Sequence, residues 1–164
     1  MSNDLIKSSA REIRKLLKKK AVSSAELLEM LETRIENIDP IVNALPTLCF
    51  DRARQNIASR DYQDTALLGM PIAIKDLLPV AGVRTTWGSM LHEHHIPDSS
   101  DLLVERLESS GAVVYAKSNT PEFGAGANTF NDVLASLGIH GIQRCRVPVP
   151  PEDRQSHSRQ GWHG

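Results

Sequence analysis

The chain has 164 residues, of which 40% are hydrophobic and 24% are charged, and its formal net charge is -1. This composition is typical of a globular domain, and the small net charge argues against a strong field for nucleic acid or anionic membranes. The two cysteines, Cys49 and Cys145, do not form a disulfide framework. The N-terminus lacks the apolar core of a signal peptide, and no apolar run of about 18 residues could span a membrane. We therefore expect a cytoplasmic protein that binds no nucleic acid, no membrane and no cofactor.

Residues 8–60 have the pattern of amphipathic helices. Two residue pairs have the serine–glutamate spacing of a capping box, Ser9 with Glu12 and Ser23 with Glu26. Apolar residues follow each box at helical intervals, which predicts two paired helices. Pro40 is predicted to end the second helix, and a third short helix is predicted over residues 51–59.

Residues 67–117 change to a strand, helix, strand pattern. The continuous apolar run from Leu67 to Ile74 predicts a strand that is buried on both faces. A helix is predicted to begin after Ser100 or Asp101 and to stop at Gly111. Residues 112–116 then predict a second buried strand. Two strands joined by a helix are expected to lie parallel, so the fold class is α/β.

Several segments of the chain resemble the amidase-signature family when they are taken together and in order. They are Gly69-Met70-Pro71-Ile72-Ala73-Ile74-Lys75-Asp76, Thr85-Thr86-Trp87-Gly88-Ser89, Gly111-Ala112-Val113-Val114 and Lys117-Ser118-Asn119-Thr120-Pro121-Glu122-Phe123. The resemblance covers roughly residues 8–133. It implies the N-terminal part of a fold in which helices flank a mixed sheet, so we expect an incomplete domain over residues 1–133 and an irregular tail over residues 134–164.

The resemblance assigns Lys75 to the lysine of a Ser–cis-Ser–Lys catalytic triad. A serine hydroxyl needs a base to become a nucleophile, and a lysine can act as that base when burial keeps it neutral. We therefore expect the end of the strand to bury Lys75. Without the surrounding motif, Lys75 would be interpreted as a strand-end lysine whose amine reaches solvent.

Other polar residues receive structural interpretations. Lys117 is expected to pair with an acid or to bind loop carbonyls, although it also ends a strand. The histidines near residue 93 suggest a metal site, but a solvated loop is favoured and no metal is predicted. Three hydroxyl residues are expected to make local turn hydrogen bonds or to line the substrate cleft, and none is expected to be a nucleophile. The candidate metal group is His92, Glu93, His94 and His95, and the hydroxyl residues are Thr85, Thr86 and Ser89.

The two serines of the triad are missing from the sequence. In the family, a Gly/Ser-rich stretch should follow the match, but the resemblance breaks after Val133. We therefore hypothesise a frameshift. If residues 139–143 are read one base earlier, their codons can encode Asn-Pro-Trp-Asn-Pro, and those of residues 146–155 can encode a Gly/Ser-rich segment. The alternatives are a genuine lineage-specific tail or an ordinary linker.

The resemblance implies that the intact relative is an amidase acting on a small-molecule carboxamide. This chain is expected to be an inactive fragment that packs loosely or dissolves poorly, because an incomplete sheet exposes apolar strand edges. Two alternatives to the amidase fragment remain open: a non-catalytic binding or interaction module, and a fragment of the glutaminase subunit of a tRNA-dependent amidotransferase. The sequence does not predict an oligomeric state.

Overall fold

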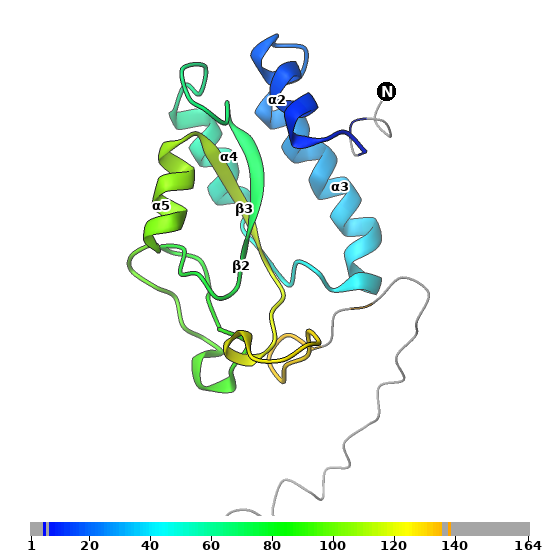
Figure 1. Cartoon of the computed structure of the whole chain (residues 1–164), viewed down its shortest axis with the longest axis vertical. Coiled ribbons are helices and arrows are strands. Elements are labelled where there is room, and N and C mark those ends of the chain that lie inside the picture. The colour runs from blue at the N-terminus through cyan, green and yellow to red at the C-terminus, as the bar shows by residue number, and fades with distance from the viewer. Residues whose placement is uncertain (1–4, 6, 136–137, 139–164) are drawn as a thin grey trace, which may run out of the picture.

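The structure is a computed structural model that describes residues 5, 7–135 and 138. A three-stranded sheet lies between helices, which gives the predicted α/β fold (Figure 1). Most of the predicted irregular segment, residues 134–164, lies outside the described residues, and so does the hypothetical shifted frame. None of the helices in the described part of the chain has the length and hydropathy of a membrane span.

Both predicted capping boxes are confirmed at the N-terminal helices α2 (Ala10–Lys18) and α3 (Ser24–Val42). At α3, the Ser23 hydroxyl accepts the Glu26 N–H, and the Glu26 carboxylate accepts the Ser23 N–H at 2.7 Å. Each box satisfies backbone donors that the first helical turn leaves free.

The end of α3 differs from the prediction, because Pro40 lies inside the helix. The helix continues to Val42 and ends at Asn43, whose backbone is left-handed with φ of 54°. The Asp39 carboxylate then accepts the N–H groups of Ala44 and Leu45. A proline in the last turn removes only one of the final hydrogen bonds, so the left-handed residue ends the helix instead.

The sheet has the order β1-β3-β2, with β1 at Thr47–Leu48, β2 at Met70–Lys75 and β3 at Ala112–Ser118. The parallel pairing of β2 and β3 confirms the prediction, and β1 is antiparallel to β3, so the sheet is mixed. β2 begins three residues later than Leu67, because Leu68 and Gly69 turn the chain with φ of 56° and 77°.

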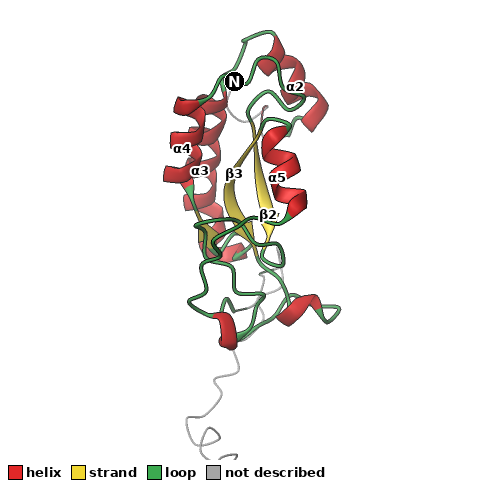
Figure 2. Cartoon of the chain, turned by 90° about the vertical axis from the view of Figure 1, so that its left-hand side faces the viewer, coloured by secondary structure: helices red, strands yellow, loops and turns green. Residues whose placement is uncertain are grey.

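The helices α4 (Phe50–Ser59) and α5 (Leu102–Ser109) complete the layers. α3 and α4 lie on one side of the sheet and α5 lies on the other (Figure 2). Asp101 caps α5 by accepting the Leu103 N–H at 2.8 Å. Ser100, the other predicted cap, instead accepts the Ala81 N–H.

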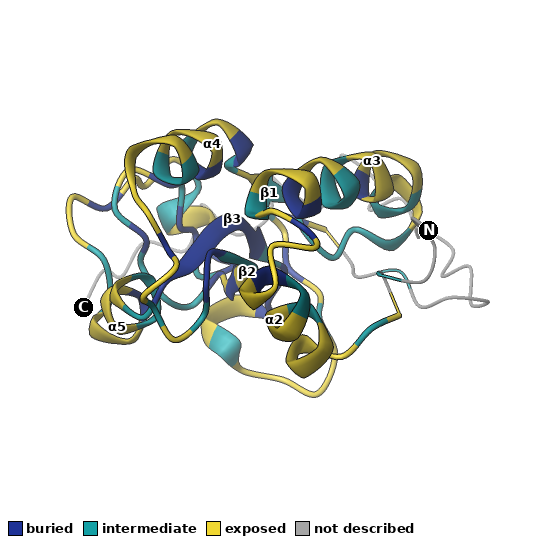
Figure 3. Cartoon of the chain, turned by 90° about the horizontal axis from the view of Figure 1, so that it is seen from above, coloured by how far each residue is buried: buried dark blue, intermediate teal, exposed yellow. Residues whose placement is uncertain are grey.

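The two strands differ in burial (Figure 3). β3 is buried along almost its whole length, as predicted. β2 is not buried on both faces, because Ala73 and Lys75 are exposed. The reason is position in the sheet: β3 has a strand on each side and helices on both faces, whereas β2 is an edge strand. A continuous apolar run does not distinguish these two environments.

Candidate functional site

The candidate site lies where the carboxyl ends of β2 and β3 meet. Ile74 pairs with Lys117, Lys75 pairs with Ser118, and the Asp76 N–H continues the ladder by donating to the Ser118 carbonyl at 3.0 Å. The loops that follow both strands gather at this end, at the bottom of Figure 1. Ligand sites of open α/β sheets form at the carboxyl ends of the strands, so this end is where chemistry is expected.

Lys75 stands at this end, but its side chain is exposed. The expectation that the strand end buries Lys75 is therefore wrong for the described structure. Side chains alternate along a strand. Ile74 points into the core beside Val80 and Val114, whereas Lys75 points to the opposite face. No described residue forms an ion pair or hydrogen bond with the Lys75 ammonium.

The buried lysine is Lys117, and it confirms the structural interpretation. Its Nζ lies 3.0 Å from Oδ1 of Asp76, and neither side chain is exposed. The ammonium also donates to the Leu78 carbonyl at 2.8 Å and to the Thr85 hydroxyl at 2.7 Å. Lys117 thus pairs with an acid and binds a loop carbonyl, as predicted.

The surroundings of Lys117 act on its pKa in opposite directions. Burial lowers the pKa of Lys117, and the nearby Asp76 carboxylate opposes that shift. A lysine ammonium has three donors, and three oxygens surround this one. The Thr85 hydroxyl donates to the Val83 carbonyl at 3.1 Å, so its oxygen is free to accept from Lys117. In this arrangement Lys117 donates to Thr85 and the Thr85 hydroxyl donates to a backbone carbonyl, so the geometry gives Thr85 a structural role.

The loop after β2 is anchored by the same carboxylate. Asp76 Oδ2 accepts the Thr86 N–H at 3.0 Å and the Thr86 hydroxyl at 2.6 Å. The predicted local turn bond of Thr86 is confirmed, because its hydroxyl accepts the Gly88 N–H at 3.0 Å. Thr86 is also fully buried, and its bonds to Asp76 reach ten residues back along the chain. Ser89 is also buried, and its hydroxyl has no hydrogen-bond partner among the described residues.

Asp76 is the member of this network that the sequence analysis left without a role, and the bond from Thr86 to Asp76 was not predicted. A signal for Asp76 was present, because the acid directly follows one strand end and the parallel neighbour also ends in a lysine. Two parallel strands bring such ends together. The partner Thr86 had no such signal, because a loop decides its position.

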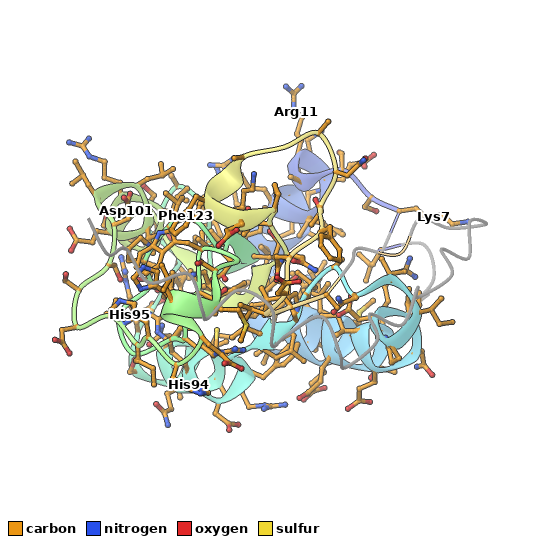
Figure 4. The ribbon with its side chains drawn as sticks, turned by 90° about the horizontal axis from the view of Figure 1, so that it is seen from below. Lys7, Arg11, His94, His95, Asp101 and Phe123 are labelled. Atoms are coloured by element: carbon orange, nitrogen blue, oxygen red, sulfur yellow. The ribbon has the colours of Figure 1, made fainter. Side chains whose placement is uncertain are left out.

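The histidine loop packs around an aromatic residue. The rings of His92 and His95 lie 4.8 Å and 5.1 Å from that of Trp87, and Phe123 lies 6.2 Å from His92. Figure 4 looks onto this end of the molecule, where His94, His95 and Phe123 lie. The described residues contain no group of three or more His, Cys, Asp or Glu side chains placed to hold a metal.

The loop after β3 is fixed by two asparagines that the sequence analysis did not single out. The buried Asn131 amide donates to Asn119 Oδ1 at 3.0 Å and to the Thr120 carbonyl at 2.7 Å. Its Oδ1 accepts the N–H groups of Val133 and Leu134. Leu134, the first residue of the predicted irregular tail, is buried, so the ordered packing continues past residue 133.

Comparison with known proteins places this geometry in a family. A family model described as Amidase matches residues 26–138. The chain is 36% identical over 136 residues to a glutamyl-tRNA(Gln) amidotransferase subunit from Thermoanaerobacter pseudethanolicus, covering 80% of this chain and 28% of that protein. It is 38% identical over 131 residues to the protein of the same name from Geotalea daltonii, covering 77% of this chain and 27% of that protein. The chain thus spans little more than a quarter of the length of these relatives.

Solved structures give the same result. An amidase crystal structure is 27% identical with a TM-score of 0.69, over 79% of this chain and 31% of that chain. An inhibitor-bound vestigial complex, related to the origins of an s-triazine catabolic enzyme, is 27% identical with a TM-score of 0.72, over 78% and 30%. Fatty acid amide hydrolase shares the fold with a TM-score of 0.73 at 21% identity, over 83% and 25%. The chain belongs to the amidase family.

Proposed function

We propose that this chain is the lysine-bearing N-terminal part of an amide hydrolase and that it is inactive by itself. The observation that supports the proposal is the place of Lys75, within the family match, at the carboxyl end of β2. The backbone there is fixed, because the Asp76 N–H bonds to β3 and the Asp76 carboxylate is held by Lys117 and Thr86. The Lys75 side chain, in contrast, is exposed.

The proposed chemistry of the complete enzyme is acyl transfer from a small-molecule carboxamide to a serine and then to water. A neutral Lys75 would take the serine proton through a second serine in the cis conformation, and backbone N–H groups would stabilise the oxyanion. The sequence has no Gly/Ser-rich segment after Val133 to supply these serines. Removing a nucleophile leaves only weak residual catalysis in serine hydrolases, so the chain alone should not turn over.

Activity assays test this proposal directly. The purified full chain should release no ammonia or carboxylate from a panel of aliphatic and aromatic carboxamides above the rate of buffer. Lys75→Met should leave that background unchanged. Turnover at an enzyme-like rate that is lost in Lys75→Met would contradict the proposal of inactivity and would require a nucleophile within this chain.

The origin of the missing motif is a separate part of the proposal. We infer a frameshift after the codon of Val133, in a cytoplasmic protein. The nucleotide sequence downstream of that codon tests it. An intact Gly/Ser-rich coding segment in the neighbouring frame is the expected result, and its absence would reject the shift. The glutaminase subunit of a tRNA-dependent amidotransferase is the alternative for the intact relative, which the names of the curated relatives favour.

The second candidate function is a non-catalytic interaction module. One observation favours it: Leu91 and several other apolar side chains are exposed at the end of the fold that carries Lys75. Capture of a specific partner by the full chain, together with an absence of turnover, would favour the module over a remnant with no function.

A further inference from the structure

The surface around α2 carries a cluster of basic residues that the proposed catalysis does not use. Residues 7–20 hold seven of the chain's 19 lysines and arginines and a single acid, Glu12. All seven basic residues are exposed, and they are Lys7, Arg11, Arg14, Lys15, Lys18, Lys19 and Lys20. The net charge of -1 conceals this asymmetry, because acids in the rest of the chain balance a segment that is strongly positive.

Four of these residues lie on one face of α2, because they are spaced three and four positions apart. We call these four residues the basic stripe: Arg11, Arg14, Lys15 and Lys18. The opposite face of the helix carries Ile13, Leu16 and Leu17, which pack into the core. In Figure 4 the Arg11 side chain points away from the body of the molecule. The basic stripe therefore faces outward on a helix whose apolar side is already in use.

The basic stripe has no acidic partner among the described residues. Every ion pair in the described part of the chain lies outside α2, as that of Arg52 with Glu108 does. The Glu12 carboxylate is occupied by the capping box, and Arg14 Nε donates to the Ala66 carbonyl at 2.7 Å. Like charges three and four positions apart repel and destabilise a helix. An anionic partner would remove that repulsion.

The helix dipole accounts for only part of this arrangement. Cations near the C-terminus of a helix are favourable, which explains Lys18, Lys19 and Lys20. Arg11 is the second residue of α2 and lies in its first turn, where the dipole disfavours a cation. The stripe thus runs along the whole helix, against the dipole at one end.

The length of the stripe fits a row of phosphates. From Arg11 to Lys18 it spans about 10 Å, at a rise of about 1.5 Å per residue. A nucleic-acid duplex presents one charge per roughly 1.7 Å of its axis, so this length faces about six phosphates. Lys7 before the helix and the two lysines after it extend the row at both ends.

An anionic membrane fits this surface less well. A helix that binds in a membrane surface inserts its apolar face, and the apolar face of α2 is packed in the core. The described residues before Ile41 expose no large hydrophobic side chain that could insert instead. Charge alone is left to bind a partner, and binding to a phosphate backbone depends mainly on charge.

We propose that the basic stripe of α2 binds the phosphate backbone of a double-stranded nucleic acid without reading its base sequence. This departs from the expectation that we drew from the net charge, because the field at a surface follows the local distribution of charge. The stripe lies near the start of β2, since Leu17 and Met70 share a core cluster, whereas Lys75 ends that strand (Figure 1). The proposal therefore does not depend on the amidase chemistry.

Fluorescence anisotropy of the full chain with labelled RNA and DNA duplexes of mixed sequence tests the proposal. Both duplexes should bind at low ionic strength, and the logarithm of the binding constant should fall with that of the salt concentration with a slope of roughly -4 or steeper. The double variant Arg11→Gln with Lys15→Gln should raise Kd by about tenfold or more and should reduce the slope by about two.

The matched control is Arg34→Gln with Arg106→Gln, which removes the same charge from exposed positions of α3 and α5. It should leave Kd and the slope nearly unchanged, because salt screens exposed charges that lie far from the bound duplex. Glutamine forms helices about as well as arginine and lysine do, so α2 should persist in the stripe variant, and circular dichroism checks this.

The outcomes decide between the stripe and its alternatives. Salt-dependent binding that weakens in the stripe variant and not in the control supports the proposal. No binding of either duplex at low ionic strength overturns it, as does an equal loss in both double variants, which would assign the binding to net charge. Vesicles of phosphatidylserine and phosphatidylcholine are the competing probe. Sedimentation of the chain with these vesicles, without duplex binding, would assign α2 to a membrane surface and overturn the proposal.

Discussion

The ammonium of Lys117 lies 3.0 Å from the carboxylate of Asp76 at the carboxyl end of the sheet, with both side chains fully buried. Taking two charges out of water is costly, and this pair recovers the cost through its remaining contacts, Thr86 on the carboxylate and Thr85 and Leu78 on the ammonium. The pair joins the two strand ends to the loop after β2, so it fixes the backbone from which Lys75 projects.

Replacing each of the two strand-end lysines by methionine should affect the free energy of unfolding to very different extents. Lys117→Met leaves the Asp76 carboxylate buried without its cation and should lower the free energy of unfolding by about 3–5 kcal/mol. Lys75→Met removes an exposed side chain and should change it by less than about 0.5 kcal/mol. Urea unfolding followed by circular dichroism measures both. The double variant Lys117→Met with Asp76→Asn should lose less unfolding free energy than the sum of the losses in the two single variants. Additive losses would mean that Lys117 and Asp76 are not coupled.

Stability should fall at alkaline pH because of Cys49. Burial raises the pKa of the Cys49 thiol from 9.0 to about 11, so the native state holds this proton more tightly than the unfolded state. The contribution of the protonated Cys49 thiol to the free energy of unfolding is complete below pH 9.0 and is lost as the pH rises to about 11. Urea unfolding across this range should show a decline that is smaller in Cys49→Ala than in the control Cys145→Ser. An equal decline in both variants would assign the effect to other groups.

Asn131 should hold the loop after β3 in place. Asn131→Ala leaves the N–H groups of Val133 and Leu134 without their acceptor, and we expect a loss of about 1–3 kcal/mol in unfolding free energy. Hydrogen exchange at those two amides should accelerate more than at amides of β3. Asn37→Ala, on the exposed side of α3, is the matched control. Unchanged protection at Val133 and Leu134 would show that other contacts fix the loop.

The second capping box should contribute measurably to the fold. Ser23→Ala removes the acceptor of the Glu26 N–H and should cost about 1 kcal/mol of unfolding free energy. Ser59→Ala, an exposed serine at the end of α4, should cost less than about 0.5 kcal/mol. Thermal denaturation of the two variants beside the unchanged chain checks the difference, and equal midpoints would argue that α3 is held by packing alone.

The isolated chain should associate as its concentration rises, through the apolar residues at the carboxyl end of the sheet. Leu91 is 84% exposed, and Leu91→Glu should reduce association without lowering the unfolding free energy by more than about 0.5 kcal/mol. Light scattering over a concentration series measures this. A chain that stays monomeric and melts sharply would contradict the expectation of loose packing or poor solubility.

Local chemistry explains what the sequence could predict. The capping boxes at Ser9 and Ser23 and the cap at Asp101 depend on residues three or fewer positions apart, so the order of the letters is enough to find them. The parallel pairing of β2 and β3 followed from the strand, helix, strand pattern. The resemblance that assigned Lys75 depended in the same way on short ordered motifs, and the family match includes that residue.

The sequence by itself thus determined the four α-helices named above, two of the three strands, the fold class and the family. Only the tertiary structure decided which strand lies at the edge, and hence that Lys75 is exposed while Lys117 is buried beside Asp76. Burial depends on which segments cover a residue, and those segments lie far away along the chain. Both lysines end an apolar strand, so local pattern cannot tell them apart; the number of neighbouring strands and covering helices does.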